Sequence, residues 1–161
     1  MGTDPDHETG TGADADPERY VVVPVGRVES DARETADSTG GALRGRPATV
    51  VVDEAYAEAL TGFDERVGTG PDALLDVVFY CDGVEDDEVE LAGESGHGLS
   101  PSGHGGVFTR RTPRRPNRLG LTTVRVVERD GLRLRVEGLD ALDGTPVLDL
   151  KPHVDWVDRL D

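Results

Sequence analysis

The sequence predicts an all-β domain with a few short helices, and three observations support that class. Several short segments are dense in valine and leucine, and stretches rich in glycine, proline and aspartate separate them. Only one segment has a clearly helical composition. The length of 161 residues fits a single domain with room for a core. Many short strands and little helix argue for a barrel or a sandwich.

Six segments are expected to form the strands, because β-branched and aromatic side chains favour the pleated backbone. They are residues 20–28, 48–53, 74–81, 121–128, 132–137 and 147–150. Pro24 marks the first segment as an edge strand or a bulge, since proline has no N–H to donate. Asp130-Gly131 is a strong hairpin signal between the fourth and fifth segments. In the fifth, apolar and charged residues alternate, which predicts one buried face.

The connections between these strands are expected to be loops and one helix. Residues 54–60 have helical composition and a helix-compatible apolar pattern. Residues 29–47 and 82–105 are polar and glycine-rich, which predicts two long loops. Residues 107–108 are expected to open a short strand, and residues 153–159 to form a terminal turn or helix.

The amino-terminal residues differ from the rest of the chain. Residues 1–18 are acidic and lack apolar periodicity, so we expect a disordered tail before a domain that spans residues 19–161. The tail has no basic region followed by an apolar run, unlike a secretory signal. No apolar stretch approaches the ~18 residues of a membrane span. We therefore expect a cytoplasmic protein with no membrane partner.

Acidic residues dominate the composition. The chain has 33 Asp and Glu against 17 Lys and Arg, a net charge of -16, and Lys151 is its only lysine. Such scattered acidity is typical of a halophilic protein kept soluble by hydrated carboxylates. Cys81 is the only cysteine, which excludes an intramolecular disulfide and a cysteine-based zinc cluster. His97 and His104 lie in a Gly/Ser loop without a defined third ligand, so we expect no metal site.

One strip of the chain is basic against this acidic background. Residues 106–125 contain six arginines and no acid. Pro113 and Pro116 restrict the backbone around the arginines, so the guanidinium groups should point in set directions. A guanidinium fork suits carboxylates and phosphates. The strip predicts an anion-binding loop or, equally, a surface loop that pairs with the protein's own acids.

A second polar segment follows the predicted hairpin. In residues 139–152, LDALDGTPVLDLKP, Asp143-Gly144 marks a tight turn that Asp140 and Asp149 flank. A turn with free backbone amides and carboxylates suits a polar ligand such as a nucleoside. Taken alone, the segment favours an ordinary turn between two strands.

Together the two segments resemble the TrmO/TsaA-like family. Gly106–Thr122, GVFTRRTPRRPNRLGLT, is similar to the hallmark Gly-Val-Phe-Ala-Thr-Arg-Ser that precedes Arg-Pro-Asn-Pro-Ile-Gly-Leu-Ser. Gly138–His153 is similar to the later Leu-Asp-x-x-Asp-Gly-Thr-Pro-Val segment of the family. The order of the segments and the intervening hairpin also agree, and residues 20–30 resemble the family's opening strand.

The resemblance implies a small β-barrel that forms a homodimer and binds S-adenosyl-L-methionine without a Rossmann fold. This fits the lack of a Gly-x-Gly-x-x-Gly motif in the chain. Such proteins methylate N6 of threonylcarbamoyladenosine at position 37 of tRNA. The implied partner is therefore the tRNA anticodon loop. Arg110, Arg114 and Arg118 are then expected to face tRNA phosphates or acids of the partner subunit.

The resemblance also implies the site residues. The family's cofactor contacts correspond here to Arg111, Leu121, Ala141, Leu142, Asp143, Gly144, Tyr80, Cys81 and Asp82. Cys81 stands where the family strand carries a histidine. The first cofactor loop is expected within residues 37–46. The proton acceptor is unassigned, and Asp143 and Asp82 are the carboxylate candidates.

Two alternatives come from other functional classes. The domain could bind S-adenosyl-L-methionine without catalysis, which the missing histidine favours. It could also be an RNA-binding β-domain without a cofactor, with the arginine loop on phosphates. Calorimetry with S-adenosyl-L-methionine separates the last alternative from the other two functions.

Overall fold

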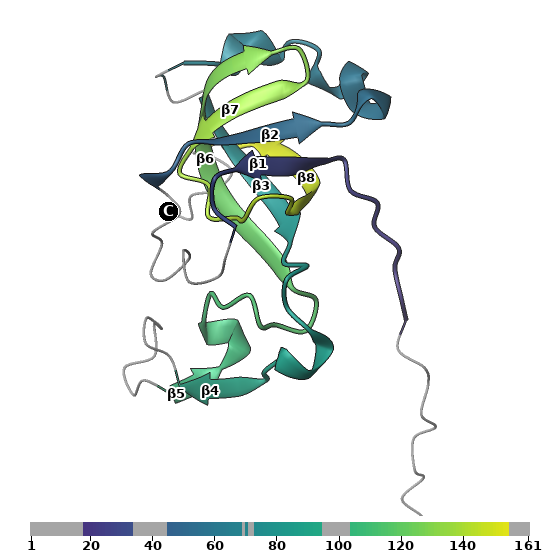
Figure 1. Cartoon of the computed structure of the whole chain (residues 1–161), viewed down its shortest axis with the longest axis vertical. Coiled ribbons are helices and arrows are strands. Elements are labelled where there is room, and N and C mark those ends of the chain that lie inside the picture. Colours follow the sequence, from purple (N-terminus) through teal and green to yellow (C-terminus); the bar gives the residue numbers. More distant parts are fainter. Residues whose placement is uncertain (1–17, 34–44, 69, 71–72, 95–103, 155–161) are drawn as a thin grey trace, which may run out of the picture.

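The main body of the protein is a closed barrel of six antiparallel strands in the order β1-β2-β7-β6-β3-β8 (Figure 1). The strands are β1 (Gly26–Ser30), β2 (Ala48–Val52), β3 (Leu74–Tyr80), β6 (Leu119–Asp130), β7 (Arg133–Glu137) and β8 (Pro146–Pro152). The computed structural model describes residues 18–33, 45–68, 70, 73–94 and 104–154. The barrel closes where Gly26 of β1 lies opposite Val147 of β8. The predicted all-β class is confirmed, as a barrel and not a sandwich.

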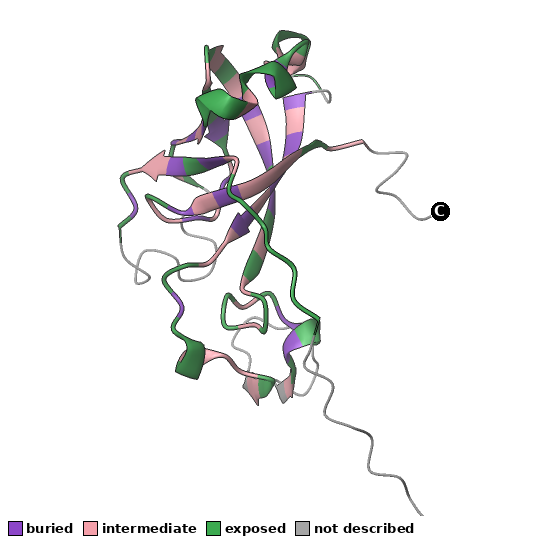
Figure 2. Cartoon of the chain, turned by 90° about the vertical axis from the view of Figure 1, so that its right-hand side faces the viewer, coloured by how far each residue is buried: buried purple, intermediate pink, exposed green. Residues whose placement is uncertain are grey.

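Alternating side chains fill the barrel. Strand β3 places Leu75, Val77 and Phe79 inside, and its other residues are half-buried. Strand β7 places Leu134 and Val136 inside, with charged residues outside. Figure 2 shows this alternation as bands along the strands. Because burial of each such side chain contributes about 1.5–3 kcal/mol, the apolar interior holds the barrel together.

The β6–β7 hairpin forms where the sequence predicts it. Asp130 pairs with Arg133, and Gly131 has a positive φ of 58° that glycine adopts without strain. Strand β6 is longer than predicted, with 12 residues, because its first residues continue to pair with β3 as far as Leu119 opposite Tyr80. One strand therefore runs from the hairpin to the opposite end of the barrel.

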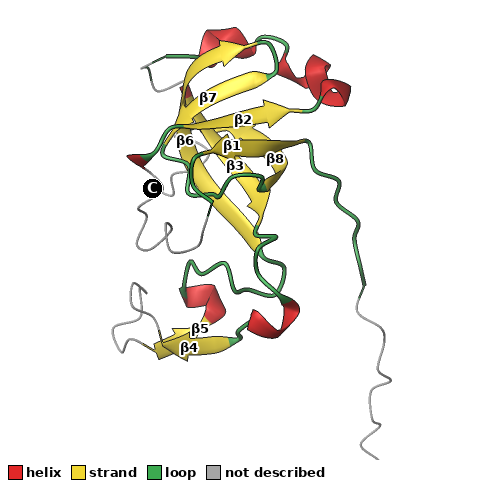
Figure 3. Cartoon of the chain, viewed as in Figure 1, coloured by secondary structure: helices red, strands yellow, loops and turns green. Residues whose placement is uncertain are grey.

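Short 3-10 helices follow β2 and lie at one end of the barrel (Figure 3). They are η2 (Glu54–Leu60) and η3 (Phe63–Arg66). The helix predicted over residues 54–60 exists, but it is a 3-10 helix interrupted at Tyr56, where φ is -111°. Its last residue, Leu60, joins the barrel core. Within the described segments, no helix is long and apolar enough to cross a membrane.

A small lobe lies at the other end of the barrel; we define it as residues 82–94 and 104–118 (Figure 1). Its elements are η5 (Asp86–Glu88), β4 (Ala92–Glu94), β5 (His104–Gly106) and η6 (Val107–Thr109), and β4 pairs with β5. The prediction of one long loop over residues 82–105 is therefore wrong. The strand expected at residues 107–108 is a 3-10 turn. Strands β4 and β5 consist mainly of residues with little strand propensity, so tertiary contacts decide their conformation.

The first strand begins later than predicted. Residues 20–25 are not strand, and residues 20–23 are 60 to 93% exposed. Pairing with β2 starts only at Gly26, opposite Val52. A run of valines favours an extended backbone, but a strand also needs a partner for its N–H and C=O groups. Pro24 lacks the backbone N–H that pairing with a neighbouring strand requires.

Several sequence predictions fall outside the described residues. The acidic tail does so except for Glu18, and the terminal turn does so after Val154. His97 and most of the expected first cofactor loop, residues 37–46, are likewise not described.

Candidate functional site

A cavity of about 940 Å³ lies between the barrel and the small lobe. Four chain segments line it: the end of β3 with the residues that follow, the arginine-rich loop after η6, the start of β6, and the turn before β8. The volume falls at the upper end of the range for small-molecule sites. Residues 106–122 and 138–153 are distant in sequence, and the closure of the barrel brings them to the same cavity.

The arginine-rich loop forms one wall of the cavity. Arg111 lines the cavity, and its Nη2 donates to the backbone carbonyl of Leu121 at 2.8 Å. Arg115 also lines it, and its Nη1 donates to the carbonyl of Arg110 at 3.1 Å. These bonds join the loop to β6 and to itself. Two guanidinium groups are thus held at the cavity wall, where an anionic part of a ligand would find donors.

Arg118 ties the loop to the end of β3. It is the one non-glycine residue with a positive φ, 50°, in the described part of the chain. Its guanidinium donates to the Val84 carbonyl and the Asp86 carboxylate, and it lies 5.4 Å from the centre of the Tyr80 ring. Its own carbonyl accepts from the N–H of Cys81 at 2.8 Å. These contacts set the distance between the barrel and the small lobe.

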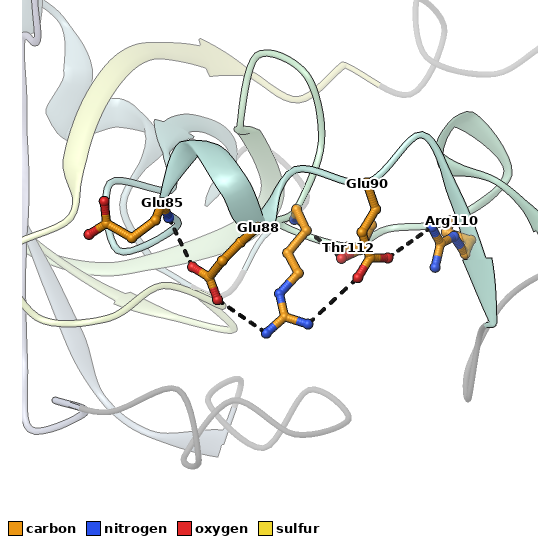
Figure 4. Close-up of polar contacts among 6 residues, drawn as sticks. Glu85, Glu88, Glu90, Arg110 and Thr112 are labelled. Carbon is orange, nitrogen blue, oxygen red and sulfur yellow. Dashed lines mark hydrogen bonds and ion pairs between the residues drawn. The ribbon is translucent and has the colours of Figure 1, made fainter.

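The other arginines of the loop pair with the chain's own acids (Figure 4). Arg110 is buried, with 6% of its side chain exposed, and its Nη2 lies 3.4 Å from Glu90 Oε2. Arg114 lies 3.4 Å from Glu88 and 3.7 Å from Glu90. Glu88 is itself held in place, because its carboxylate accepts the N–H of Glu85 at 2.9 Å.

The burial of Arg110 corrects one expectation from the sequence, which stays a prediction for Arg114 and Arg118. Arg110 is enclosed by its own chain and so does not face tRNA phosphates or a partner subunit. Arg114 and Arg118 form ion pairs within the lobe, with Glu88 and Asp86. The reason is the fold of the lobe, which places the acids around η5 beside the arginines. Of the two alternatives for the basic strip, pairing with the protein's own acids holds for these three arginines.

The turn before β8 forms the opposite wall. Ala141 and Leu142 line the cavity, whereas Asp143 and Gly144 do not. The Asp143 carboxylate accepts the N–H of Ser30 at 3.0 Å and lies 3.7 Å from Arg33. The backbone N–H of Asp143 donates to the carbonyl of Ala32, just after β1, and that of Gly144 donates to the carbonyl of Val28 in β1. Asp143 thus fastens the turn to the barrel, and its carboxylate is directed to β1.

The end of β3 places Cys81 and Asp82 on the cavity, while Tyr80 lies beneath Arg118. Asp82 is exposed and lines the cavity, whereas the other carboxylate candidate, Asp143, does not line it. Burial is the main cause that raises the pKa of the Cys81 thiol to about 11; the carboxylates of Asp82 and Asp140 contribute to the rise, and Arg115 opposes it. Cys81 is therefore a neutral thiol at physiological pH and a poor nucleophile.

Sequence reasoning missed several residues that line the cavity. They are Phe79, Val84, Phe108, Gly120, Thr122 and Thr145; Asp140, which the sequence indicated as a carboxylate flanking the turn, also lines the cavity. Phe79 lies against Gly120, where an added Cβ would come within 2.2 Å of the ring. The glycine in the Leu-Gly-Leu segment was the available signal for this close approach. Phe108, Leu119 and Leu121 remain 83, 47 and 50% exposed, so apolar surface surrounds the cavity.

The comparison with known families decides the membership of the chain. The sequence profile of the tRNA-methyltransferase O N-terminal domain matches residues 38–159, which include all the cavity walls. The chain belongs to this family. No group of three or more potential metal-ligating side chains occurs among the residues that the structure describes.

Individual relatives of this tRNA-methyltransferase O domain match over shorter stretches. A probable S-adenosyl-L-methionine-binding protein of Archaeoglobus fulgidus is 57% identical over 55 residues, 34% of this chain and 15% of that protein. A tRNA (adenine(37)-N6)-methyltransferase of Eikenella corrodens is 50% identical over 56 residues, 33% of this chain and 32% of that protein. The matched stretches thus span less than a third of the length of each of these two relatives.

A solved structure extends the likeness to the fold. The crystal structure of TrmO from Pseudomonas aeruginosa superposes with a TM-score of 0.66 and 28% identity, over 89% of this chain and 60% of that chain. The family resemblance stated from the two sequence segments is confirmed. The assignment of individual cofactor contacts stays a prediction.

Proposed function

We propose that this domain binds S-adenosyl-L-methionine in the cavity between barrel and lobe and transfers its methyl group to tRNA. The proposed target is N6 of threonylcarbamoyladenosine at position 37. The observation that carries the proposal is the convergence of both family segments on one cavity of about 940 Å³. The names of the relatives, S-adenosyl-L-methionine-binding protein and tRNA (adenine(37)-N6)-methyltransferase, support the cofactor and the substrate class.

The side chains around the cavity fit this cofactor. Leu121, Ala141 and Leu142 offer apolar surface for an adenosine moiety. Arg111 and Arg115 offer guanidinium donors for a carboxylate, and Arg111 is held in place by the Leu121 carbonyl. The proposed contacts therefore include Arg111, Leu121, Ala141, Leu142, Cys81 and Asp82. Tyr80, Asp143 and Gly144 do not line the cavity, and their proposed role is to position the residues that do.

When bound, S-adenosyl-L-methionine supplies a methyl group activated by a positively charged sulfur. The walls of the cavity hold the reacting groups in line and limit the access of water. As the bond from N6 to the methyl carbon forms and the bond from sulfur to carbon breaks, N6 loses a proton. Asp82 is exposed at the cavity and is the better-placed acceptor. Asp143 is held by Ser30 and Arg33 and is the weaker candidate.

The substrate side of the proposal is the anticodon loop, bound by a cytoplasmic homodimer. With a net charge of -16, the chain repels tRNA at long range, so contacts must be close. Phe108 is 83% exposed beside the cavity and offers a surface on which a base can stack. A strictly monomeric protein in sedimentation at micromolar concentration and working salt contradicts the dimer without affecting cofactor binding.

A calorimetric titration of S-adenosyl-L-methionine into the parent and Arg111→Ala tests the cofactor site. Loss of a charge-assisted bond should weaken binding by about 1.5–3 kcal/mol, roughly 10- to 100-fold. Arg135→Ala is the matched control, because Arg135 is exposed and pairs with Glu128 on the barrel surface. Equal affinity in parent and Arg111→Ala removes Arg111 from the site.

Catalysis requires a separate test, because a catalytically silent cofactor-binding module remains the second candidate. The engagement of Asp143 with Ser30 favours that alternative, since it leaves Asp82 as the one candidate acceptor at the cavity. Mass analysis of anticodon-loop nucleosides, after incubation of the protein with tRNA and cofactor, separates the two. Methylated threonylcarbamoyladenosine supports the enzyme, and cofactor binding without that product supports the silent module.

A further inference from the structure

Asp140 carries a polar atom that the fold does not satisfy. Its side chain lines the cavity, and its Oδ1 is buried without a hydrogen-bond partner in the described part of the chain. The neighbours Leu139 and Ala141 are 1 and 6% exposed. Both neighbours belong to the barrel core, so the backbone on either side of Asp140 is packed against it.

An oxygen in this position is costly. A carboxylate oxygen that leaves water and finds no donor loses its hydration without compensation. Nearly all buried polar atoms in folded proteins have a partner, so an exception calls for a functional explanation. Two arginines that line the cavity with it bond elsewhere: Arg115 donates to the Arg110 carbonyl, and Arg111 donates to the Leu121 carbonyl.

We propose that Asp140 is a binding residue whose carboxylate accepts an N–H from an amino or ammonium group of a ligand in the cavity. The identity of that ligand rests on the proposed function. A guanidinium on one wall and a carboxylate on the other match the two charges of an amino-acid group. The cofactor's α-ammonium is thus one source of the donor, and the amino nitrogen of the target base is the other.

The first test measures stability and affinity together, with the full chain. Asp140→Asn and Asp140→Ala remove the uncompensated charge, so the melting temperature of the ligand-free protein stays level or rises. If Asp140 contacts the cofactor's α-ammonium, the affinity for S-adenosylhomocysteine, measured by calorimetry, should fall 10- to 100-fold. Asp130→Asn, at the exposed hairpin end of β6, is the control and should change neither quantity.

A second ligand distinguishes the two sources of the N–H. An analogue of S-adenosylhomocysteine without the α-ammonium should bind the parent and Asp140→Asn equally if Asp140 contacts that ammonium. If Asp140 contacts the base instead, the affinity for S-adenosylhomocysteine is unchanged and kcat/KM for tRNA falls at saturating cofactor. Unchanged affinity together with unchanged kcat/KM overturns the proposal.

The two proposals fail separately. If the parent binds neither S-adenosyl-L-methionine nor its product, the proposed function fails. The melting temperatures of the Asp140 variants then still test the inference about Asp140. A higher melting temperature in Asp140→Ala than in the parent supports a carboxylate that serves ligand binding at the expense of stability. A fall in both variants overturns the inference, because it shows that Asp140 stabilises the fold.

Discussion

The barrel and the small lobe are held together by different forces. The barrel interior is almost entirely apolar, with valines and leucines from six strands packed against one another. In the described part of the lobe, only Val84 and Val107 are buried apolar residues. The lobe depends instead on arginines paired with acids and on backbone hydrogen bonds. Apolar burial is non-directional, whereas ion pairs fix particular groups in particular places.

The difference explains how an acidic protein can carry a basic loop beside its cavity. The lobe's acids neutralise Arg110, Arg114 and Arg118, which leaves Arg111 and Arg115 at the cavity without a carboxylate partner among the described ion pairs. The barrel supplies a fixed wall, and the lobe supplies charged groups in set positions. Changes in the barrel should therefore affect the whole fold, and changes in the lobe should affect the cavity.

The largest effect is expected from Leu134→Ala in the barrel. Leu134 is fully buried, and its truncation leaves a cavity in the core. The free energy of unfolding should fall by about 2–5 kcal/mol. Thermal or urea unfolding measures the loss, and all barrel amides should exchange faster together. A loss confined to the small lobe would contradict the division into two regions.

The reactivity of Cys81 measures how far the boundary between the barrel and the lobe is closed to solvent. A thiol with a pKa of about 11 has roughly 100-fold less thiolate at pH 8 than one with the ordinary pKa of 9.0, so alkylation should slow accordingly. Because the folded pKa exceeds the unfolded one, the associated stability is complete below pH 9 and is lost as the pH rises toward 11. Iodoacetamide labelling followed by mass spectrometry measures the rate. A rate equal to that of the urea-unfolded chain would show that Cys81 is open to solvent.

A smaller, local effect is expected from Arg110→Ala in the lobe. Removal of this buried guanidinium leaves Glu90 with only its pair to the exposed Arg114, and should cost about 1.5–3 kcal/mol. Hydrogen exchange should accelerate in residues 84–94 and 104–118, while the core strands stay protected. Affinity for the cofactor should also fall, since the cavity wall loosens. Uniform destabilisation of barrel and lobe would argue against a lobe that unfolds by itself.

The smallest effect is expected from Arg114→Gln, the matched comparison for Arg110. Its side chain is 51% exposed, so its pairs with Glu88 and Glu90 lie in water. Exposed ion pairs contribute at most about 1 kcal/mol, and salt weakens them. The same exchange measurement should detect little change at high salt. A loss as large as that of Arg110→Ala would show that burial does not decide the strength of these pairs.

The sequence predicted the barrel better than the lobe. Residues 48–53, 74–81 and 132–137 alternate or are dense in β-branched side chains, and each forms a strand within a residue or so of the prediction. Strands β4 and β5 lack that signal. They form because they pair with each other within the lobe. The opposite error occurred at residues 20–24, which have high strand propensity but precede the first paired residues of β1.

The site was predictable in its segments but not in its individual neighbours. The resemblance led to both family segments, and six of the nine residues expected to contact the cofactor line the cavity. Thr122 was missed, and Asp140 was named only as a carboxylate flanking the turn, because strand register and turn geometry decide which side chains face inward. The pairing of Arg110 with Glu90 was not foreseeable either, since the fold of the lobe joins residues 20 positions apart.

The most direct measurement of the central claim is a titration of S-adenosyl-L-methionine into the parent and Leu121→Glu. Leu121 lines the cavity and is 50% exposed, so the fold tolerates a charge there while the apolar wall is lost. The account predicts saturable binding to the parent, at least a 10-fold weaker affinity in the variant, and equal melting temperatures without ligand. Absence of binding to the parent, or equal affinity in both proteins, would contradict a cofactor site between the barrel and the lobe.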